Sequence, residues 1–90
     1  MATLKIPTPL RPYVNGQAEL LYSATTVSGI LDSLFNDFPA FKLHLCRDDG
    51  TLHSFIHIFV NGQDIRSLKG ILTPIGPSDV LNLVPSIAGG

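Results

Sequence analysis

The residues best suited to chemistry are the last two of the chain, Gly89 and Gly90. Glycine has no Cβ, so a Gly-Gly segment can enter a channel too narrow for side chains and adopt dihedral angles closed to other residues. The α-carboxyl group has an ordinary pKa of about 3.5 and is a carboxylate at neutral pH. Such a carboxylate can attack the α-phosphate of ATP to form a mixed anhydride, which sulfide, a thiolate or an amine can attack in turn. On its own Gly-Gly is a weak signal, because terminal residues are often only a frayed end.

Three other sets of reactive side chains have spacings that argue against a site. His53 and His57 lie four residues apart, which on a strand separates them by about 13 Å. One metal ion needs its ligands at about 2 Å, so we expect no metal site there. Asp48 and Asp49 are followed by glycine, which is typical of a turn, and adjacent carboxylates rarely face each other across a substrate. Cys46 is a lone cysteine and is expected to be a small buried filler.

The composition bounds the size and class of the protein. Its 90 residues suffice for one small domain, and the 44% hydrophobic and 14% charged content excludes a disordered charged tail. Six Lys and Arg against seven Asp and Glu leave no basic field for nucleic acid. A full dinucleotide-binding or barrel enzyme domain needs a longer chain. These numbers favour a small carrier or binding module over an enzyme.

The hydropathy pattern predicts no membrane segment. The longest dense apolar stretch runs from Phe55 to Val60 and is interrupted by His57, whereas a bilayer-spanning helix needs roughly 20 apolar residues. No apolar run of signal-peptide length follows Met1. We therefore expect a cytoplasmic protein.

The first half of the chain predicts a hairpin followed by a helix. Segments 3–6 and 17–22 alternate as strands do, and the prolines of 7–12 with Asn15-Gly16 predict a wide loop between them. Apolar residues then recur at helical spacing after the candidate N-caps Thr25 and Thr26, and a proline ends the helix near residue 37. The helical stripe consists of Val27, Ile30, Leu31, Leu34 and Phe38.

The second half predicts further strands. Segment 55–60 is the clearest strand, Asn61-Gly62 turns it, and 63–66 can pair back. Segment 80–84 is the last strand. Residues 39–54 are ambiguous, because the alternation within 42–45 fits either a short strand or an extended loop.

The order of these elements predicts an α+β fold. One main helix lies across one face of a mixed sheet of four to five strands, giving two layers around one core. A right-handed crossover then places the first and last strands side by side at the centre. This arrangement is the β-grasp, or ubiquitin-like, fold. We expect residues 1–85 to form that domain and residues 86–90 to form a flexible tail.

The strand over 55–60 has a second apolar face. Phe55, His57 and Phe59 point away from the isoleucine face that the helix covers, and an exposed apolar patch of this kind usually marks a partner surface. The alternative is that segment 39–54 folds over the two phenylalanine rings. Arg66 and Lys69 follow the hairpin and can ring the partner face.

The end of the chain carries a resemblance to a known family. Segment 80–90, VLNLVPSIAGG, looks like the terminal signature of the MoaD/ThiS family of ubiquitin-like sulfur carriers: a hydrophobic strand, proline, a small residue, an aliphatic residue, alanine and two glycines. Segment 52–66, LHSFIHIFVNGQDIR, resembles the central strand and hairpin of the CysO branch of that family. The opening residues 6–17 resemble that branch too.

The resemblance implies a role for each residue near the tail. The carboxylate of Gly90 would be adenylated and then converted to a thiocarboxylate, and Ala88 and Gly89 would form the slim tail inside a partner's channel. Family members dock through the sheet face near the tail, so Phe59 is the first candidate contact. The other candidate partner-binding residues are Phe55, Arg66 and Ile87.

The same resemblance implies the partners. An adenylyltransferase and sulfurtransferase similar to ubiquitin-activating enzymes would bind ATP, so this chain would carry no cofactor and would be a co-substrate rather than an enzyme. The sulfur would pass to a cysteine synthase, the large subunit of molybdopterin synthase or a thiazole synthase, and a zinc metalloprotease can act on the product. Two other functions remain open: a ubiquitin-like modifier joined through Gly90 to lysines of target proteins, and a passive interaction module.

Overall fold

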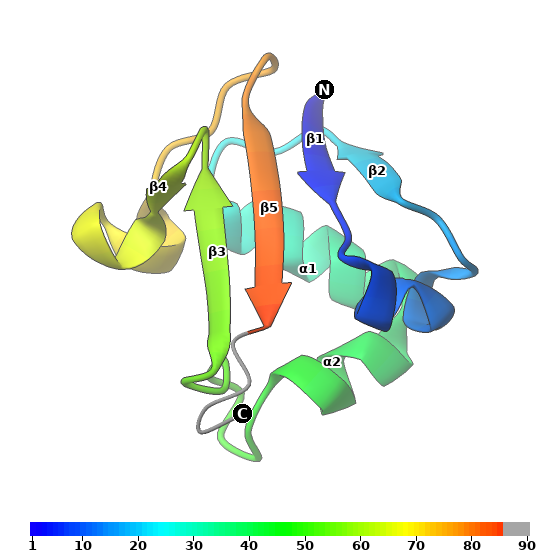
Figure 1. Cartoon of the computed structure of the whole chain (residues 1–90). Helices are drawn as coiled ribbons and strands as arrows, with labels where there is room; N and C mark the ends of the chain where they lie inside the picture. The colour runs from blue at the N-terminus through cyan, green and yellow to red at the C-terminus, as the bar shows by residue number, and fades with distance from the viewer. Residues whose placement is uncertain (86–90) are drawn as a thin grey trace.

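The fold is a five-stranded mixed sheet with helices packed on one face (Figure 1). The computed structural model describes residues 1–85 of the 90-residue chain. The first and last strands pair in parallel, while the other neighbours are antiparallel. The predicted central placement of these two strands is confirmed. In sheet order the strands are β2 (Glu19–Tyr22), β1 (Ala2–Lys5), β5 (Val80–Pro85), β3 (Ile56–Val60) and β4 (Gln63–Asp64).

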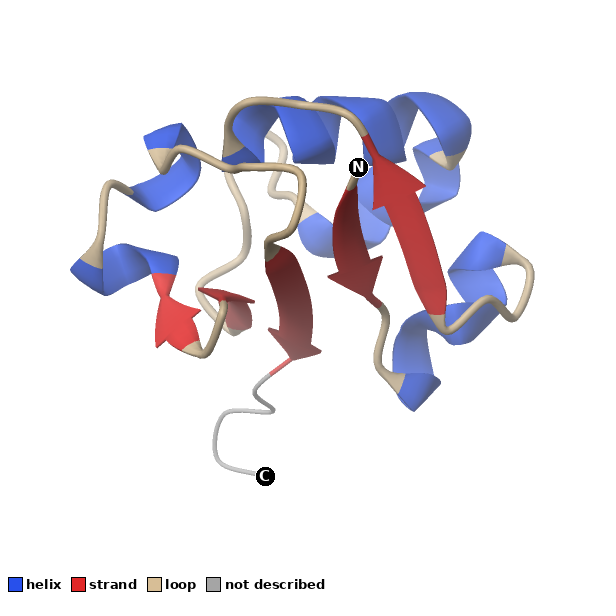
Figure 2. Cartoon of the chain, turned by 90° about the horizontal axis from the view of Figure 1, so that it is seen from above, coloured by secondary structure: helices blue, strands red, loops and turns tan. Residues whose placement is uncertain are grey.

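The helix α1 (Val27–Asp37) covers one face of the sheet (Figure 2). It begins as predicted, because the side-chain oxygen of Thr26 accepts a hydrogen bond of 3.1 Å from the amide of Gly29. Its apolar stripe meets the inward side chains of the strands, and burying these groups is the main favourable term in folding. The core formed there includes Leu4, Ile30, Leu34, Ile58, Leu81 and Leu83.

A second helix, α2 (Pro39–Leu45), replaces the strand or extended loop expected within residues 39–54. Proline at its first position suits a helix start, because that amide would have no partner within the helix. Phe41 and Leu45 lie four residues apart on one face and are both fully buried. Leu43 is 83% exposed, so the alternation of Leu43 and Leu45 that suggested a strand does not reflect burial.

The hairpin of β1 and β2 is confirmed, and its wide loop contains a 3₁₀ helix, η1 (Thr8–Val14). The loop buries Leu10 and Val14, so it extends the core beyond the strands. Asn15 ends η1 with a left-handed φ of 58°, a conformation that asparagine tolerates better than most residues. The Asn15-Gly16 turn therefore ends a helix rather than joining two strands directly.

The turn between β3 and β4 ties β3 to the start of β5. Asn61 and Gly62 have φ values of 50° and 88°, as a tight hairpin turn of this sequence requires. The side-chain amide of Asn61 donates to Asp79 at 2.9 Å, and its carbonyl oxygen accepts from the amide of Val80 at 3.0 Å. β3 begins at Ile56, one residue later than expected, and Phe55 belongs to the preceding turn.

The hairpin leads into two more short 3₁₀ helices, η2 (Ile65–Ser67) and η3 (Gly70–Leu72), of which η3 contacts α1. Within residues 1–85, each helix is too short, or too polar, to cross a membrane.

Candidate functional site

The end of β5 fixes the point from which the Gly-Gly tail leaves the domain. β5 is paired on both sides, and its last residue, Pro85, lies opposite Ile56 of β3. Its inward side chains Leu81 and Leu83 are 0% and 1% exposed, so the strand is anchored in the core. The predicted tail residues lie outside the described residues: Ile87, Ala88, Gly89 and Gly90.

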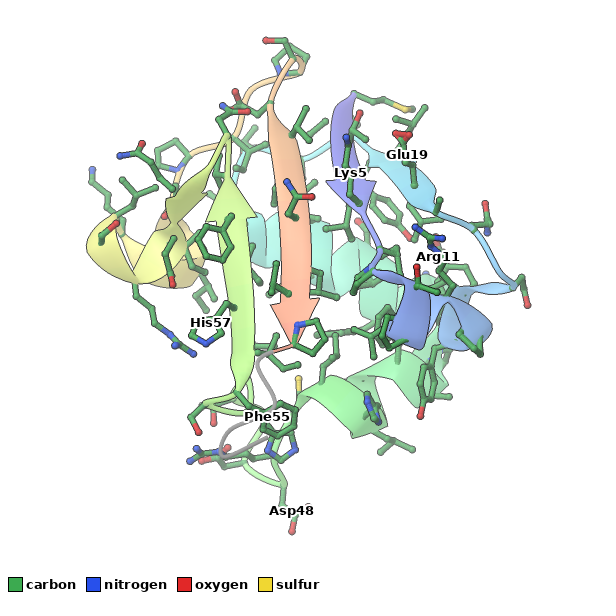
Figure 3. The ribbon with its side chains drawn as sticks, viewed as in Figure 1. Lys5, Arg11, Glu19, Asp48, Phe55 and His57 are labelled. Carbon is green, nitrogen blue, oxygen red and sulfur yellow. The ribbon has the colours of Figure 1, made fainter. Side chains whose placement is uncertain are left out.

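The sheet face opposite α1 is called here the outer face (Figure 3). It extends along β5 to Pro85, the last residue of that strand. The strand register places five outward residues in one row across the sheet. His57 and Val84 form the next pair toward the end of β5, and Val84 is 39% exposed. The row consists of Asp64, Phe59, Asn82, Lys5 and Glu19.

The two predicted phenylalanine contacts have different surroundings. Phe55 is half-buried, packs against the core, and stacks on the ring of His53 with centroids 4.9 Å apart. Phe59 is also half-buried, and its centroid lies 6.5 Å from that of His57 on the same strand. Segment 39–54 thus contributes a cover for Phe55, while Phe59 keeps part of its ring on the outer face.

Arg66, predicted to contact a partner, bonds to its own domain. Its Nη2 atom donates to the carbonyl oxygens of Ser54 at 2.9 Å and Ile56 at 3.0 Å. Hydrogen bonds from a charged guanidinium are stronger than neutral ones. Arg66 therefore holds the start of β3, the strand paired with the end of β5. Its exposed side chain leaves a partner contact possible, and that contact stays a prediction.

His57 lies between a cation and an anion. Its Nδ1 atom is 3.0 Å from Nη1 of Arg66 and 3.3 Å from Oδ2 of Asp64. A protonated Nδ1 donates to Asp64, and an unprotonated Nδ1 accepts from Arg66. The pKa of Asp64 is lowered, first by the hydrogen bond from the Arg66 amide and then by His57. The tautomer of His57 therefore decides whether Nδ1 bonds to Asp64 or to Arg66.

Two cations beside the end of β5 were not singled out by sequence reasoning. Lys5 and Arg11 line a shallow pocket with Asn82 and Val84, and Figure 3 shows both side chains on the outer face. The Nε atom of Arg11 donates to the carbonyl oxygen of Ile6 at 3.0 Å, which fixes the base of the side chain. Only the adjacency of β1 and β5 brings these cations close to the end of β5, so the sequence alone held no signal for them.

Two other reactive side chains of the sequence, Cys46 and Asp49, are respectively buried and hydrogen-bonded to a neighbouring residue. Cys46 is buried, and burial raises the pKa of its thiol despite the opposing effect of nearby Lys42. Asp49 accepts two hydrogen bonds from Thr51, which lower the pKa of its carboxyl group. In the described part of the chain, no three His, Cys, Asp or Glu side chains are grouped for a metal ion.

Comparison with known proteins decides the family. The ThiS family model matches residues 4–90, almost the whole chain including the tail. The chain belongs to the ThiS family. The CysO sulfur carrier protein of Mycobacterium tuberculosis is 33% identical over 90 residues, covering 98% of this chain and 97% of the relative. A putative sulfur carrier protein of Archaeoglobus fulgidus is 41% identical over 46 residues, about half of each chain.

Solved structures of ThiS-family and related proteins share the fold. CysO of Amycolatopsis orientalis, solved in complex with BexX, has a TM-score of 0.88 and 31% identity over the full length of both chains. Small archaeal modifier protein 1 of Methanosarcina acetivorans has a TM-score of 0.85 and 32% identity, covering 99% and 95% of the two chains. The β-grasp prediction is confirmed, and the curated relatives support a sulfur-carrier role.

Proposed function

We propose that this ThiS-family protein carries sulfur on the C-terminal carboxyl group of Gly90. The observation that carries the proposal is the Gly-Gly pair, which ends five residues beyond a buried central strand and lies inside a segment that the family model matches to its last residue. Five extended residues span about 17 Å. The tail is thus long enough to enter a partner's active site while the domain stays outside.

The chemistry has two steps, and the partner enzyme supplies the catalytic groups. A carboxylate oxygen of Gly90 attacks the α-phosphorus of ATP, and pyrophosphate leaves, which forms an acyl-adenylate. A sulfide equivalent then attacks the carbonyl carbon, and AMP leaves, which forms the thiocarboxylate. The protein is therefore a co-substrate, and Ala88 and Gly89 keep the tail slim enough for the channel.

The outer face is the proposed docking surface. Phe59 offers part of an aromatic ring, and Lys5 and Arg11 supply positive charge toward the end of β5. Aromatic and arginine side chains are enriched among residues that dominate binding energy. Phe55, Arg66 and Ile87 complete the proposed contacts, with Arg66 also holding the start of β3.

The proposed partners follow from this chemistry. An adenylyltransferase similar to ubiquitin-activating enzymes binds ATP and transfers sulfur to Gly90. The acceptor is a cysteine synthase, the large subunit of molybdopterin synthase or a thiazole synthase, with cysteine synthase favoured by the similarity to CysO. A zinc metalloprotease is a further proposed partner that removes the product. We propose a cytoplasmic location for these reactions, as the sequence predicts.

A second function uses the same activated tail. In a protein modifier, the amine of a target lysine attacks the carbonyl carbon of Gly90 in place of sulfide. The similarity to a small archaeal modifier protein at 32% identity and a TM-score of 0.85 favours keeping this alternative. The two functions share the first chemical step and differ in the nucleophile of the second.

ATP–pyrophosphate exchange with the activating enzyme tests the first step. We expect exchange with the wild-type chain and none with a chain extended by one alanine after Gly90, because the attacking carboxylate is displaced. Circular dichroism of the extended chain serves as the control for folding. Equal exchange by the two chains would contradict the proposal.

The docking surface has its own test in the same assay. Phe59→Ala should raise the KM for the carrier about five- to thirtyfold, as expected for loss of a partly buried aromatic contact worth about 1–2 kcal/mol. Leu72→Ala removes a 68% exposed apolar side chain from η3 and is the matched control. An unchanged KM for Phe59→Ala would show that Phe59 does not belong to the docking surface.

A further inference from the structure

Within residues 1–85, the outer edge of β2 has backbone hydrogen-bonding groups that no other strand uses. Among the described strands, β2 has β1 as its neighbour on one side and lies at the edge of the sheet. The amide of Ile6 donates to the carbonyl oxygen of Ala18 at 2.8 Å, which fixes the phase of the antiparallel ladder. Because bonded pairs alternate along such a ladder, Leu20 and Tyr22 turn their backbone groups toward β1, and Glu19 and Leu21 turn theirs outward.

A groove runs along this same edge. Its lining includes Glu19 and Leu21, whose side chains lie on the outer face, as well as Leu20 and Tyr22 from the opposite face. Side chains alternate between the two faces of a strand. One groove can therefore be lined by residues of both faces only where it follows the free edge of that strand. Leu21 is 59% exposed, so an apolar side chain is available beside the outward backbone groups.

The groove is acidic. Glu19 and Asp37 line it, and its lining contains no lysine or arginine. Asp37 is the last residue of α1, whose last turn holds no basic residue, so its carboxylate adds to the negative end of the helix dipole. The Tyr22 hydroxyl donates to Asp37 at 3.1 Å and holds the carboxylate at the groove. Glu19 also lines the neighbouring pocket with Lys5, its partner on β1, and Arg11, so Asp37 is the acidic group of the groove that has no cation beside it in either lining.

We infer that the β2 edge binds an extended segment of a partner protein in which apolar residues alternate with lysine or arginine. The segment adds a sixth strand to the sheet, and its backbone bonds to the outward groups of Glu19 and Leu21. Main-chain pairing of this kind supplies affinity, and side-chain pockets supply specificity. Because side chains alternate between the two faces of a strand, the basic ones lie on the helix face beside Asp37 and the apolar ones lie on the outer face beside Leu21. This surface is independent of the Gly-Gly tail.

Nuclear magnetic resonance titration tests the inference on the full chain without ATP or any enzyme. The probe is the capped peptide Thr-Val-Lys-Val-Lys-Val-Thr, and the control peptide carries Glu in place of Lys. We expect the backbone amide signals of Glu19 and Leu21 to shift and their hydrogen exchange to slow with the lysine peptide only. Shifts absent from β2, or equal for the two peptides, would overturn the inference.

Variants separate backbone pairing from charge. Leu21→Pro removes one outward amide, which an edge strand tolerates because β1 does not use it, and should abolish binding. Asp37→Asn should weaken binding about two- to fivefold and reduce its salt dependence. Asp48→Asn changes the charge at a distant turn and should have no effect (Figure 3). If Leu21→Pro does not fold, the comparison of the groove carboxylate variant with Asp48→Asn still tests the inference.

A second copy of this chain is the competing occupant. Pairing of two β2 edges would give a concentration-dependent dimer in analytical ultracentrifugation, with changes at Glu19 and Leu21 in the absence of peptide. That result would overturn the inference of a basic peptide. A monomer at all concentrations, together with peptide-dependent shifts, is the result expected.

Discussion

Replacing Arg66 by alanine should loosen the strand that supports the tail. The substitution removes the donors to the carbonyl oxygens of Ser54 and Ile56, which the side chain contacts at 2.9 and 3.0 Å. Each such bond contributes about 0.5–1.5 kcal/mol net, and partial solvent exposure favours a total of about 1–2 kcal/mol. In a domain of this size each kcal/mol lowers Tm by about 4–8 °C. We therefore expect Tm to fall by about 5–15 °C.

Thermal unfolding and hydrogen exchange together locate this effect. The amide of Val84, which lies opposite His57 in the ladder, should exchange faster in Arg66→Ala, because the start of β3 opens more often. Arg66→Lys keeps the charge but loses the two-pronged geometry, so its Tm should lie between those of the wild type and the alanine variant.

The opposite pattern would refute the positioning role. If Arg66→Ala left Tm and the Val84 exchange unchanged while raising the KM for the activating enzyme, Arg66 would be a partner contact alone. If Arg66→Lys behaved like the wild type in every assay, charge rather than the hydrogen-bond geometry would be the property that matters.

Three further predictions test the core and the titrating groups. Leu83→Ala should lower the free energy of unfolding in urea by about 2–5 kcal/mol, and a near-neutral effect would contradict a buried central β5. Burial, followed by the hydrogen bond that the Tyr22 hydroxyl donates to Asp37, raises the pKa of Tyr22 from 10.0 to about 12 in the folded chain. The contribution of the Tyr22 hydroxyl to the free energy of unfolding is thus complete below a pH of about 10 and is lost as pH rises through about 12. The urea midpoint of Tyr22→Phe should therefore change less than that of the wild type over this range. Iodoacetamide should alkylate Cys46 much more slowly in the folded chain than in urea, because burial raises the thiol pKa and blocks access; equal rates would show that the site opens.

The sequence predicts the fold where burial follows a simple period. Alternation in β3 and β5, the helical stripe of α1 and the Thr26 cap all reflect local preferences that the tertiary structure reinforces. α2 could not be predicted this way, because a seven-residue helix shows only two buried positions, Phe41 and Leu45. In so short a segment the strand and helix periods cannot be told apart.

The candidate site also contains residues that the sequence predicts and residues that only the tertiary structure identifies. Gly89, Gly90 and Phe59 are visible in the sequence because their residue types or strand phase mark them. The bonds of Arg66 to Ser54 and Ile56 depend on where η2 places the arginine, and the position of Lys5 beside β5 depends on strand order. The free edge of β2 likewise follows only from the complete sheet order.

Mass spectrometry of the C-terminal peptide, on protein isolated from its own cell, shows whether Gly90 carries sulfur. Trypsin should cut after Lys69 and release the peptide 70–90, which contains neither methionine nor cysteine, so side-chain oxidation does not imitate the gain of sulfur. We expect a terminal thiocarboxylate that iodoacetamide alkylates. A free carboxylate in every preparation, even after addition of ATP, sulfide and the activating enzyme, would contradict the proposed sulfur-carrier function.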